Sequence, residues 1–427
     1  MLARDAAYAA GLLASSPLWG ASLLRTGKWR TDWAGRFGRG PSGETLENAG
    51  GPRILFCAVS VGEVNALRGL VDALRSGPEP CGLVLAVTTN TGVDRAQQLY
   101  GGREGVAVVR YPLDFSWAVG RFLDAIRPDL VATVELELWP NFVAAARLRG
   151  VPVAIVNGRL SERSFRRYRL ARPLVRSAFA AVAAAGVQTQ AYGRRFVALG
   201  TPAERVRVLD TMKWDNAVVR AKAGVPGAAE LAEAMGIDRD RPLVVAGSTG
   251  PGEPAFLLRG RPRDAQLLIA PRKPEHFAAA AAACAADGAG FGRRSTAVRG
   301  TSGVFLLDTI GELGRAYALA DVAIVGRSFL GDLYGSDAME PAALGVPTMI
   351  GPHHKDFAET VAIMRNAGGL LVTDDPASTT AELLANPTLA AEVAAAGQAV
   401  ILAHQGATAR HARMLRDLLP PAAGGTD

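Results

Sequence analysis

The sequence is poor in the residues that build metal and redox sites. It has three cysteines, Cys57, Cys81 and Cys284, and five histidines among 427 residues. An odd number of widely spaced cysteines offers neither a Cys-x-x-Cys pair for zinc nor a disulfide framework. The histidines are dispersed except for His353 and His354, which stand in a loop and, being adjacent, are poorly placed to ligate one metal ion. We therefore expect no bound metal and a reducing compartment.

Several short catalytic motifs are also missing. The sequence has no Gly-x-x-x-x-Gly-Lys-Ser/Thr, His-Glu-x-x-His or Gly-x-Ser-x-Gly string and no EF-hand loop. The usual signals for P-loop phosphoryl transfer, zincin proteolysis and α/β-hydrolase chemistry are therefore absent. Residues 38–43 match Gly-x-Gly-x-x-Gly, but they precede the first expected strand, and Pro41 stands where a helix would have to open. We interpret them as a loop.

The amino-terminal segment, residues 1–40, contains a long uncharged stretch followed by a basic one. Residues 6–24 contain no charge, and as a helix they would extend about 28 Å, nearly the thickness of the apolar core of a bilayer. Pro17 and several serines make this a poor spanning segment. Residues 25–40 then place five cations against one acid, interleaved with aromatic residues. We predict that this segment forms a membrane-associated helix and that the chain from residue 25 onward lies on the cytoplasmic side. The alternative is an amino-terminal helix packed on the body of the protein.

Beyond Gly51, short apolar runs alternate with segments of helical length, which is the βαβ pattern of a parallel sheet. A first set of expected strands covers 53–59, 83–89, 129–134, 152–156 and 181–188. A second set covers 242–247, 267–270, 303–307, 321–325 and 347–350. The sequence therefore predicts two Rossmann-like domains, 41–215 and 241–427, joined by a helix-containing connection at 216–240.

Acidic residues follow two expected strands of the first domain. Glu63 stands in the turn after the first strand, and Glu135 and Glu137 follow strand 129–134. Parallel strands end at a common edge, where α/β proteins bind ligands, so a carboxylate there can act as a base. The alternative for Glu63 is a solvated residue that complements a helix dipole. The strand period of two sends Glu135 and Glu137 to one side, and Arg159, after the next strand, is their candidate partner.

Residues 159–176 form a strongly basic stretch, with seven arginines and one glutamate. Such a stretch suits phosphate groups or anionic lipid headgroups, and an arginine face exposed to solvent is the alternative. The net charge of +7 likewise favours a negatively charged partner. No recognised nucleic-acid-binding module accompanies the basic stretches, so we expect no nucleic acid.

In the second domain, polar and basic residues follow three successive strands. Residues 247–253, Gly-Ser-Thr-Gly-Pro-Gly-Glu, have the pattern of an anion-cradling turn before a helix. Arg272 and Lys273 follow the next strand, and residues 326–331 follow a later one. Glu340, beside a helix start, is placed to accept hydrogen bonds from ribose hydroxyls. Together these residues predict a pocket for a nucleotide mono- or diphosphate.

Five longer strings stand in order along the chain: AVSVGE (58–63), ELELWPN (135–141), GRLSERS (158–164), GELGRAYALADVAIVG (311–326) and MEPAALGVPTMIGPHHKDF (339–357). With them the chain resembles the 3-deoxy-D-manno-octulosonic acid (Kdo) transferases of lipopolysaccharide assembly over most of its length. The resemblance implies the GT-B fold, in which two Rossmann-like domains face a central cleft. It also implies an inverting, metal-independent glycosyltransferase without a cofactor, with CMP-Kdo as donor, a lipid A precursor as acceptor, and attachment to the cytoplasmic face of the inner membrane.

The resemblance further implies roles for single residues. Glu63 matches the general base proposed for the family, which would deprotonate an acceptor hydroxyl as it attacks the anomeric carbon. Glu137 and Arg159 match positions near the acceptor and the active cleft. Because CMP leaves already ionised, its phosphate needs cations and N–H donors rather than a general acid. The residues expected at the donor are Ser248, Thr249, Arg272, Lys273, Gly326, Ser328, Lys213 and Glu340.

The sequence departs from the family pattern in several places, most of them in the second domain. Similar proteins usually have histidine where this chain has Gly250, Lys273 and residues 336–338. They usually have glycine in place of Arg327 and asparagine in place of Thr211. The departures leave two alternatives open: a GT-B-like transferase or epimerase that uses another nucleotide sugar, and a catalytically impaired paralogue at the membrane surface.

Overall fold

The computed structural model describes residues 5, 6, 8–11, 13, 16, 31–40, 51–76, 79–288, 290–331 and 333–420. The chain divides into two units, Met1–Asn216 together with Gly406–Asp427, and Ala217–Gln405. These limits differ from the predicted domains in two respects. Nearly all of the predicted connection 216–240 belongs to the second unit, and the residues after Gln405 belong to the first.

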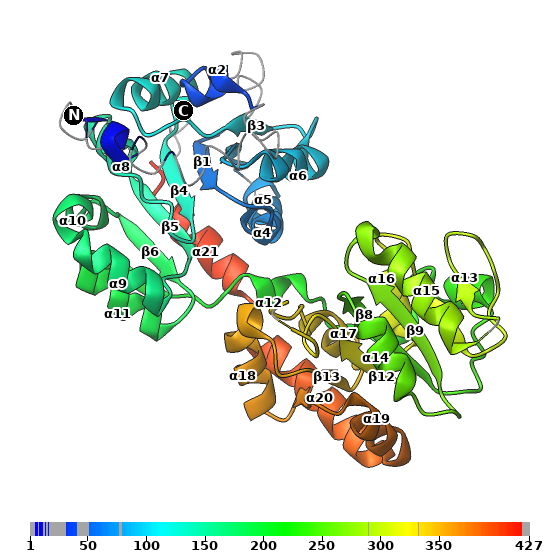
Figure 1. Ribbon diagram of the computed structural model, residues 1–427. Helices are drawn as coiled ribbons and strands as arrows, with labels where there is room; N and C mark the ends of the chain where they lie inside the picture. The colour runs from blue at the N-terminus through cyan, green and yellow to red at the C-terminus, as the bar shows by residue number, and fades with distance from the viewer. Residues whose placement is uncertain are drawn as a thin grey trace, which may run out of the picture. The chain divides into compact units, whose positions relative to one another are not determined.

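The first unit is built on a parallel sheet. Within its described residues, seven strands lie in the order β3-β2-β1-β4-β5-β6-β7, and every neighbouring pair is parallel (Figure 1). The central strands are continuous apolar runs because both faces of the sheet are covered. The strands are β1 (Arg53–Ala58), β2 (Gly82–Val87), β3 (Val106–Arg110), β4 (Leu130–Val134), β5 (Val153–Gly158), β6 (Ala184–Val187) and β7 (Val206–Val208).

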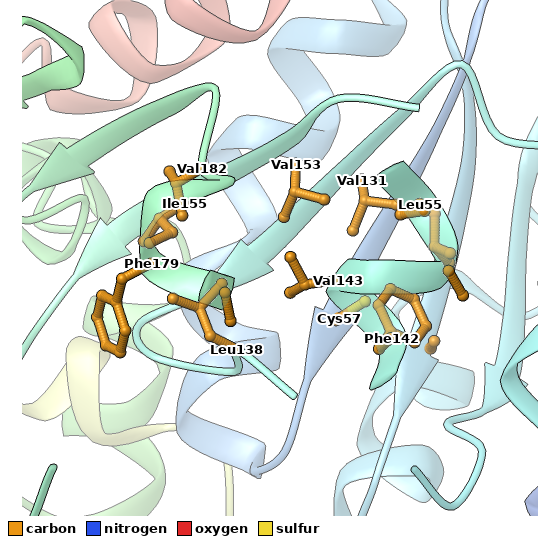
Figure 2. Packing of buried hydrophobic residues seen from close by; sticks show 14 of the residues in the cluster. Leu55, Cys57, Val131, Leu138, Phe142, Val143, Val153, Ile155, Phe179 and Val182 are labelled. Atoms are coloured by element: carbon orange, nitrogen blue, oxygen red, sulfur yellow. The ribbon is translucent and has the colours of Figure 1, made fainter. Parts of the chain in front are cut away.

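Helices cover both faces of this sheet. They are α2 (Trp33–Arg36), α4 (Val61–Ala66), α5 (Arg68–Arg75), α6 (Asn90–Tyr100), α7 (Ser116–Ile126), α8 (Pro140–Leu148), α9 (Glu162–Leu170), α10 (Arg172–Ala180), α11 (Gln190–Leu199), α12 (Lys213–Asn216) and α21 (Ala407–Arg416). One face packs against α7, α8, α10 and α11, and Figure 2 shows Phe142 and Phe179 of that layer with Leu55, Val131 and Ile155 of the strands. The opposite face packs against α4, α5, α6 and α21.

The second unit repeats this architecture. Its described residues form a parallel sheet in the order β10-β11-β9-β8-β12-β13-β14. The strands are β8 (Leu243–Thr249), β9 (Gln266–Pro271), β10 (Gly292–Arg293), β11 (Val304–Leu306), β12 (Val322–Val325), β13 (Thr348–Ile350) and β14 (Leu371–Val372). The helices are α13 (Ala228–Met235), α14 (Glu253–Arg259), α15 (Phe277–Asp287), α16 (Leu313–Leu319), α17 (Met339–Ala343), α18 (Ala358–Asn366), α19 (Pro376–Ala385) and α20 (Pro387–His404). Helices α13 and α16 cover one face, and α14, α15 and α19 cover the other.

The prediction of two parallel α/β sheets is confirmed. Each predicted strand is present, with ends shifted by a few residues. The apolar pattern missed β3, which has five residues, and the short strands β7, β10 and β14, whose two or three residues are too few to show a period. Helix α13, predicted as part of a connection, instead packs Leu231 and Met235 into the core of the second unit.

The amino-terminal segment packs on the first unit where the structure describes it. The Asp5 carboxylate accepts the backbone N–H of Ser116 (2.8 Å), and the ring of Tyr8 meets that of Phe115 edge-on (5.0 Å between centroids). Asp5 therefore caps α7, because Phe115 has no side-chain acceptor for this purpose. Most of the predicted membrane segment 6–24 lies outside the described residues, and no helix among those described is long and apolar enough to cross a membrane.

Helix α21 returns the carboxyl-terminal part of the chain to the first sheet (Figure 1). The Asp215 carboxylate holds the start of this helix by accepting the N–H groups of Gly406 (2.6 Å) and Thr408 (2.5 Å). Further along, His411 is fully buried, and its Nε2 accepts the N–H of Asn157 in β5 (2.9 Å). A helix from the end of the chain thus supports the carboxyl end of β5.

This contact predicts a pH-dependent stability. Burial lowers the pKa of His411 to about 4, with Arg410 adding to the shift and Asp215 opposing it. Because the unfolded chain binds this proton near pH 6.5, stability is lost as the pH falls from 6.5 towards 4. Over that range we expect the free energy of unfolding to fall by about 3 kcal/mol more in wild type than in His411→Gln. Denaturant unfolding measures this, and equal losses would contradict a buried neutral imidazole.

Candidate active site

Both sheets reverse their winding direction at their first strand in sequence. In the first unit β1 lies between β2 and β4, and in the second β8 lies between β9 and β12. At such a point the loops leave neighbouring strands towards opposite faces, and open α/β sheets bind ligands there, outside the carboxyl ends of the strands. We call these two places the switch points. The residues that follow β1 and β4, or β8 and β12, are the first candidates for chemistry.

Glu63 lies in the turn from β1 into α4. The hydroxyl of Ser60 accepts the N–H of Glu63 (3.4 Å) and donates to Glu63 Oε1 (2.9 Å). Glu63 Oε2 accepts the N–H of Val59 (2.8 Å). This Ser-x-x-Glu arrangement resembles a capping box, and the sequence carries its signature. It holds the carboxylate at the carboxyl end of β1, at the first switch point.

The surroundings of Glu63 change its acidity. Burial raises the pKa of Glu63 to about 7, the charges of Glu135 and Glu137 add to the shift, and the hydrogen bonds from Val59 and Ser60 oppose it. At neutral pH the carboxyl group is therefore divided between its ionised and protonated forms. That property suits a residue that exchanges protons, and a glutamate in open solvent at a helix start would not have it.

The acids after β4 are arranged differently from the prediction. The strand ends at Val134, and Glu135 starts a turn with a φ of 57°. The expectation that a continuing strand sends Glu135 and Glu137 to one side is therefore wrong. Glu137 Oε2 accepts the indole N–H of Trp139 (2.9 Å). Burial raises the pKa of Glu137, that hydrogen bond opposes the shift, and Glu135 adds to it.

Arg159 lies at the same edge, after β5. Its N–H donates to the carbonyl of Glu135 (3.4 Å), which joins the turns after β4 and β5. Asn157, two residues before, is fully buried with a φ of 54°, and its Oδ1 accepts the N–H of Met212 (3.2 Å). The next residue, Lys213, belongs to the first unit, whereas the other residues of the predicted donor set belong to the second. Of the three residues predicted as catalytic, Glu63 and Glu137 lie at the first switch point within electrostatic reach of each other, and Arg159 follows the neighbouring strand β5.

The second switch point is formed by the ends of β8 and β12. Ser248 has a φ of 55°, and Thr249 is fully buried, with a hydroxyl that lacks a hydrogen-bond partner among the described residues. Gly326 follows β12, and a Cβ at this position would come within 2.6 Å of the Thr249 Cα, so only glycine fits. Ser248, Thr249 and Gly326 of the predicted donor set therefore lie together.

The turn predicted to cradle an anion is occupied by a carboxylate of the chain itself. Glu253 is fully buried. Its Oε2 accepts the N–H groups of Gly250 (2.7 Å) and Arg327 (2.6 Å). Its Oε1 accepts those of Ser328 (2.8 Å) and Phe329 (3.0 Å). Glu253 thus uses one N–H group of the predicted turn, that of Gly250, and three of the loop after β12, so these four are not available to a phosphate.

Ser328 also has a structural role. It is fully buried, and its hydroxyl donates to the carbonyl of Val325 (2.6 Å) and accepts the N–H of Gly351 (2.8 Å). Since its backbone N–H is bonded to Glu253 as well, Ser328 holds the loop after β12 in place. The structure therefore does not support the prediction that Ser328 contacts a donor.

The two cations predicted after β9 differ in their surroundings. Arg272 is exposed, and its N–H donates to the carbonyl of Thr249 (3.0 Å), which fixes it beside the end of β8. Lys273 is also exposed, and its ammonium group pairs with Glu275 (3.1 Å). Arg272 is thus the better candidate for contact with a ligand at the second switch point.

Glu340, at the start of α17, lies within electrostatic reach of Arg272. Burial raises the pKa of Glu340, the charge of Asp337 adds to the shift, and Arg272 and Arg220 oppose it. Asp337 and Arg220 were not predicted as parts of this group, and no pattern in the sequence indicates them. The structural role of Glu253 was not predicted either, although that residue stands three positions after Gly250, as Glu63 stands three after Ser60.

A largely apolar cavity of about 410 Å³ lies elsewhere in the second unit. Its lining includes Val244 and Leu267, near the starts of β8 and β9, and Pro376 of α19. These are the opposite strand ends from Thr249 and Arg272, so the cavity is separate from the switch point. In the part of the chain that the structure describes, no cluster of three or more histidine, cysteine or acidic side chains could hold a metal ion.

Comparison with solved structures defines the class. Anabaena Alr3699/HepE in complex with UDP matches with a TM-score of 0.58 at 13% identity, over 86% of this chain and 100% of that chain. Acinetobacter baumannii MurG matches with a TM-score of 0.51 at 16% identity, over 86% of this chain and 99% of that chain. At these identities the likeness concerns the fold alone, which is of the GT-B type with two parallel-sheet α/β units.

Comparison of sequences defines the family. A family profile described as 3-Deoxy-D-manno-octulosonic-acid transferase (kdotransferase) matches residues 31–216. The 3-deoxy-D-manno-octulosonic acid transferase of Bordetella pertussis is 35% identical, over 94% of this chain and 95% of that protein. The enzyme of the same description from Haemophilus influenzae is 30% identical, over 86% of each. The chain therefore belongs to the Kdo transferase family, and the resemblance found in the five strings is confirmed.

Proposed function

We propose that the protein transfers Kdo from CMP-Kdo to a hydroxyl group of a lipid A precursor, with inversion at the anomeric carbon and without a metal ion. The observation that carries the proposal is Glu63, a partly buried carboxylate at the first switch point with a pKa raised to about 7. It stands in a chain that is 35% identical to a Kdo transferase over nearly its whole length. The fold places this side chain at the first switch point, and its carboxylate is the group that accepts a proton.

Glu63 acts as the general base. In its ionised form it takes the proton that the acceptor hydroxyl loses as the hydroxyl oxygen bonds to the anomeric carbon. A base with a pKa near the working pH combines a useful ionised fraction with enough basicity to accept that proton. Glu135 and Glu137 contribute by raising its pKa through repulsion. Arg159 lies on the same edge as a cation for an anionic acceptor.

The second unit binds the donor at its switch point. Arg272 supplies positive charge for the phosphate of CMP, and Glu340 accepts hydrogen bonds from the ribose hydroxyls. The buried hydroxyl of Thr249, which lacks a partner among the described residues, is available to a donor oxygen. As the bond between the anomeric carbon and the phosphate oxygen breaks, CMP keeps the electron pair and leaves as an anion. No general acid is required for that step.

We also propose that the first unit works at an anionic membrane surface, the cytoplasmic face of the inner membrane. An aromatic row, Trp33, Phe37, Trp117 and Phe115, supports this. Successive rings in the row are stacked, with centroids 5.9, 5.7 and 6.2 Å apart. Trp33, Phe37 and Trp117 are exposed, and exposed aromatic rings are typical of surfaces that enter a membrane interface.

The basic stretch gives the same proposal a second support. In α9 and α10, Leu170 and Leu174 are 86% and 66% exposed, among the arginines of residues 159–176. Apolar side chains surrounded by arginines suit a surface of anionic headgroups. The contribution of residues 6–24 stays a prediction, since most of them lie outside the described residues.

The catalytic role predicts a selective loss in Glu63→Gln. The amide cannot accept the proton, so we expect transfer of Kdo to fall by at least about 100-fold, the scale of a lost general base. Affinity for CMP, which involves the other unit, should be nearly unchanged. Transfer assays and titration with CMP measure the two effects, with Glu104→Gln, an exposed glutamate of the same unit, as the matched control.

Normal transfer by Glu63→Gln would remove this residue from the base role. A chain stabilised by UDP but not by CMP would favour an enzyme for another nucleotide sugar. Binding of neither nucleotide would favour an impaired paralogue at the membrane surface. The two nucleotide-binding outcomes therefore each select one of the alternatives left open by the departures from the family pattern.

The membrane proposal predicts a loss of vesicle binding in a Trp33→Ala, Trp117→Ala double variant. Burial of one such ring contributes on the order of 1.5 kcal/mol, so the double variant should bind vesicles of anionic phospholipid at least about tenfold more weakly. Sedimentation with vesicles measures this. Ile310→Ala, which removes an exposed apolar side chain from the second unit, is the control. Unchanged binding, together with a loss in Leu170→Ala, Leu174→Ala, would move the membrane surface to α9 and α10.

A further inference from the structure

Arg327 has an unusual backbone for a residue with a side chain. Its φ of 60° lies in the left-handed region, which glycine normally occupies. The conformation is held by Glu253, whose Oε2 accepts the Arg327 N–H (2.6 Å) while its Oε1 accepts the next two N–H groups of the loop. Strain that the surrounding structure maintains in this way is commonly found where a side chain has a function.

A glycine on the neighbouring loop sets the path of this side chain. A Cβ on Gly250 would lie 3.3 Å from Arg327 Cγ and 2.3 Å from Leu333 Cδ1, so these two side chains fill the space over residue 250. The guanidinium Nη2 donates to the carbonyl of Leu333 (2.8 Å). Gly250 and Arg327 are both departures from the family pattern, and the arginine side chain occupies space that a side chain at position 250 would need.

The Arg327 side chain lies at the second switch point, where its positive charge is not neutralised by the described residues. Arg327 follows Gly326, which touches Thr249 at the end of β8. Within the described part of the chain, its guanidinium donates to a carbonyl rather than pairing with a carboxylate. A carbonyl does not neutralise the positive charge, and one hydrogen bond uses only one of five guanidinium donors.

We infer that Arg327 binds the phosphate group of the nucleotide donor and that Glu253 is the positioning residue that aims it. The inference rests on the proposed function, since it assigns a residue to the donor site. A nucleotide phosphate at this point would ordinarily meet backbone N–H groups, but here Glu253 uses three of those in the loop after β12 and that of Gly250 in the loop after β8. A side-chain cation is therefore needed, and a guanidinium can form two parallel bonds to phosphate oxygens.

The test compares CMP with cytidine, which lacks the phosphate, by isothermal titration of the full chain. The variant is Arg327→Gly, because glycine adopts a φ of 60° without strain while the charge is removed. We expect the affinity for CMP to fall at least about tenfold and that for cytidine to stay within about twofold of wild type. Without ligand, the thermal unfolding midpoint should be unchanged or higher. Arg327→Gln, which keeps a side chain at this position, should lose CMP affinity as well.

Two matched variants separate charge from backbone. Ala297→Gly relieves another left-handed residue of the second unit, with a φ of 54°, and Arg263→Gly removes an exposed arginine from a turn. Both should bind CMP as wild type does. Glu253→Gln should weaken CMP binding when Arg327 is present and add little in the Arg327→Gly background, because the carboxylate acts through that side chain.

The outcomes separate this inference from the proposed function. Unchanged CMP affinity in Arg327→Gly, or an equal loss of CMP and cytidine affinity, would overturn the inference and leave the proposed function standing. A Glu253→Gln effect of the same size with and without Arg327 would overturn the positioning role. A wild-type chain that binds neither CMP nor cytidine would overturn the proposed function and the inference with it.

Discussion

Hydrogen bonds from Val59 and Ser60 fold the carboxylate of Glu63 back onto its own turn, and the active site depends on this short-range constraint. The turn holds the group at the carboxyl end of β1, where partial burial removes water from it. Glu135 and Glu137 oppose its ionisation, while the two hydrogen bonds favour it. The balance leaves the pKa of Glu63 at about 7. One glutamate can therefore be held by the turn that Ser60 caps and still accept a proton at neutral pH.

The second unit uses a glutamate in the corresponding turn for a different purpose. Glu253 follows β8 as Glu63 follows β1, but it is fully buried and accepts four backbone N–H groups. A carboxylate saturated in this way organises two loops and has no capacity left for proton transfer. The N–H groups of Gly250, Arg327, Ser328 and Phe329 are thereby unavailable to a phosphate, and the proposals assign its charge to the cations Arg272 and Arg327. In the proposed mechanism, proton transfer belongs to the first unit and the binding of phosphate charge to the second.

Local features of the sequence predicted the sheets and Glu63. The βαβ alternation and the turn after the first strand each depend on a few consecutive residues, and the five strings placed the chain in its family. The left-handed backbone of Glu135 and Ser248 could not be predicted, because tertiary packing at the strand ends imposes it on residues that do not prefer it. Ser328 looked like a ligand contact because a serine in a glycine-rich loop has the same pattern whether it faces a ligand or the loop itself. The return of α21 depends on the distant contact between His411 and Asn157, which no local pattern carries.

The ionisation of Glu63 is the property that most directly decides whether it can act as the base. Carbon-13 NMR titration of the glutamate carboxyl groups in the full chain measures it, with Glu63→Gln to assign the signal. We expect a midpoint near pH 7 in wild type, and a lower one in Glu135→Gln, because that variant removes a neighbouring negative charge. A wild-type midpoint near 4.5, the ordinary value for glutamate, would contradict the assignment of Glu63 as a base poised for neutral pH.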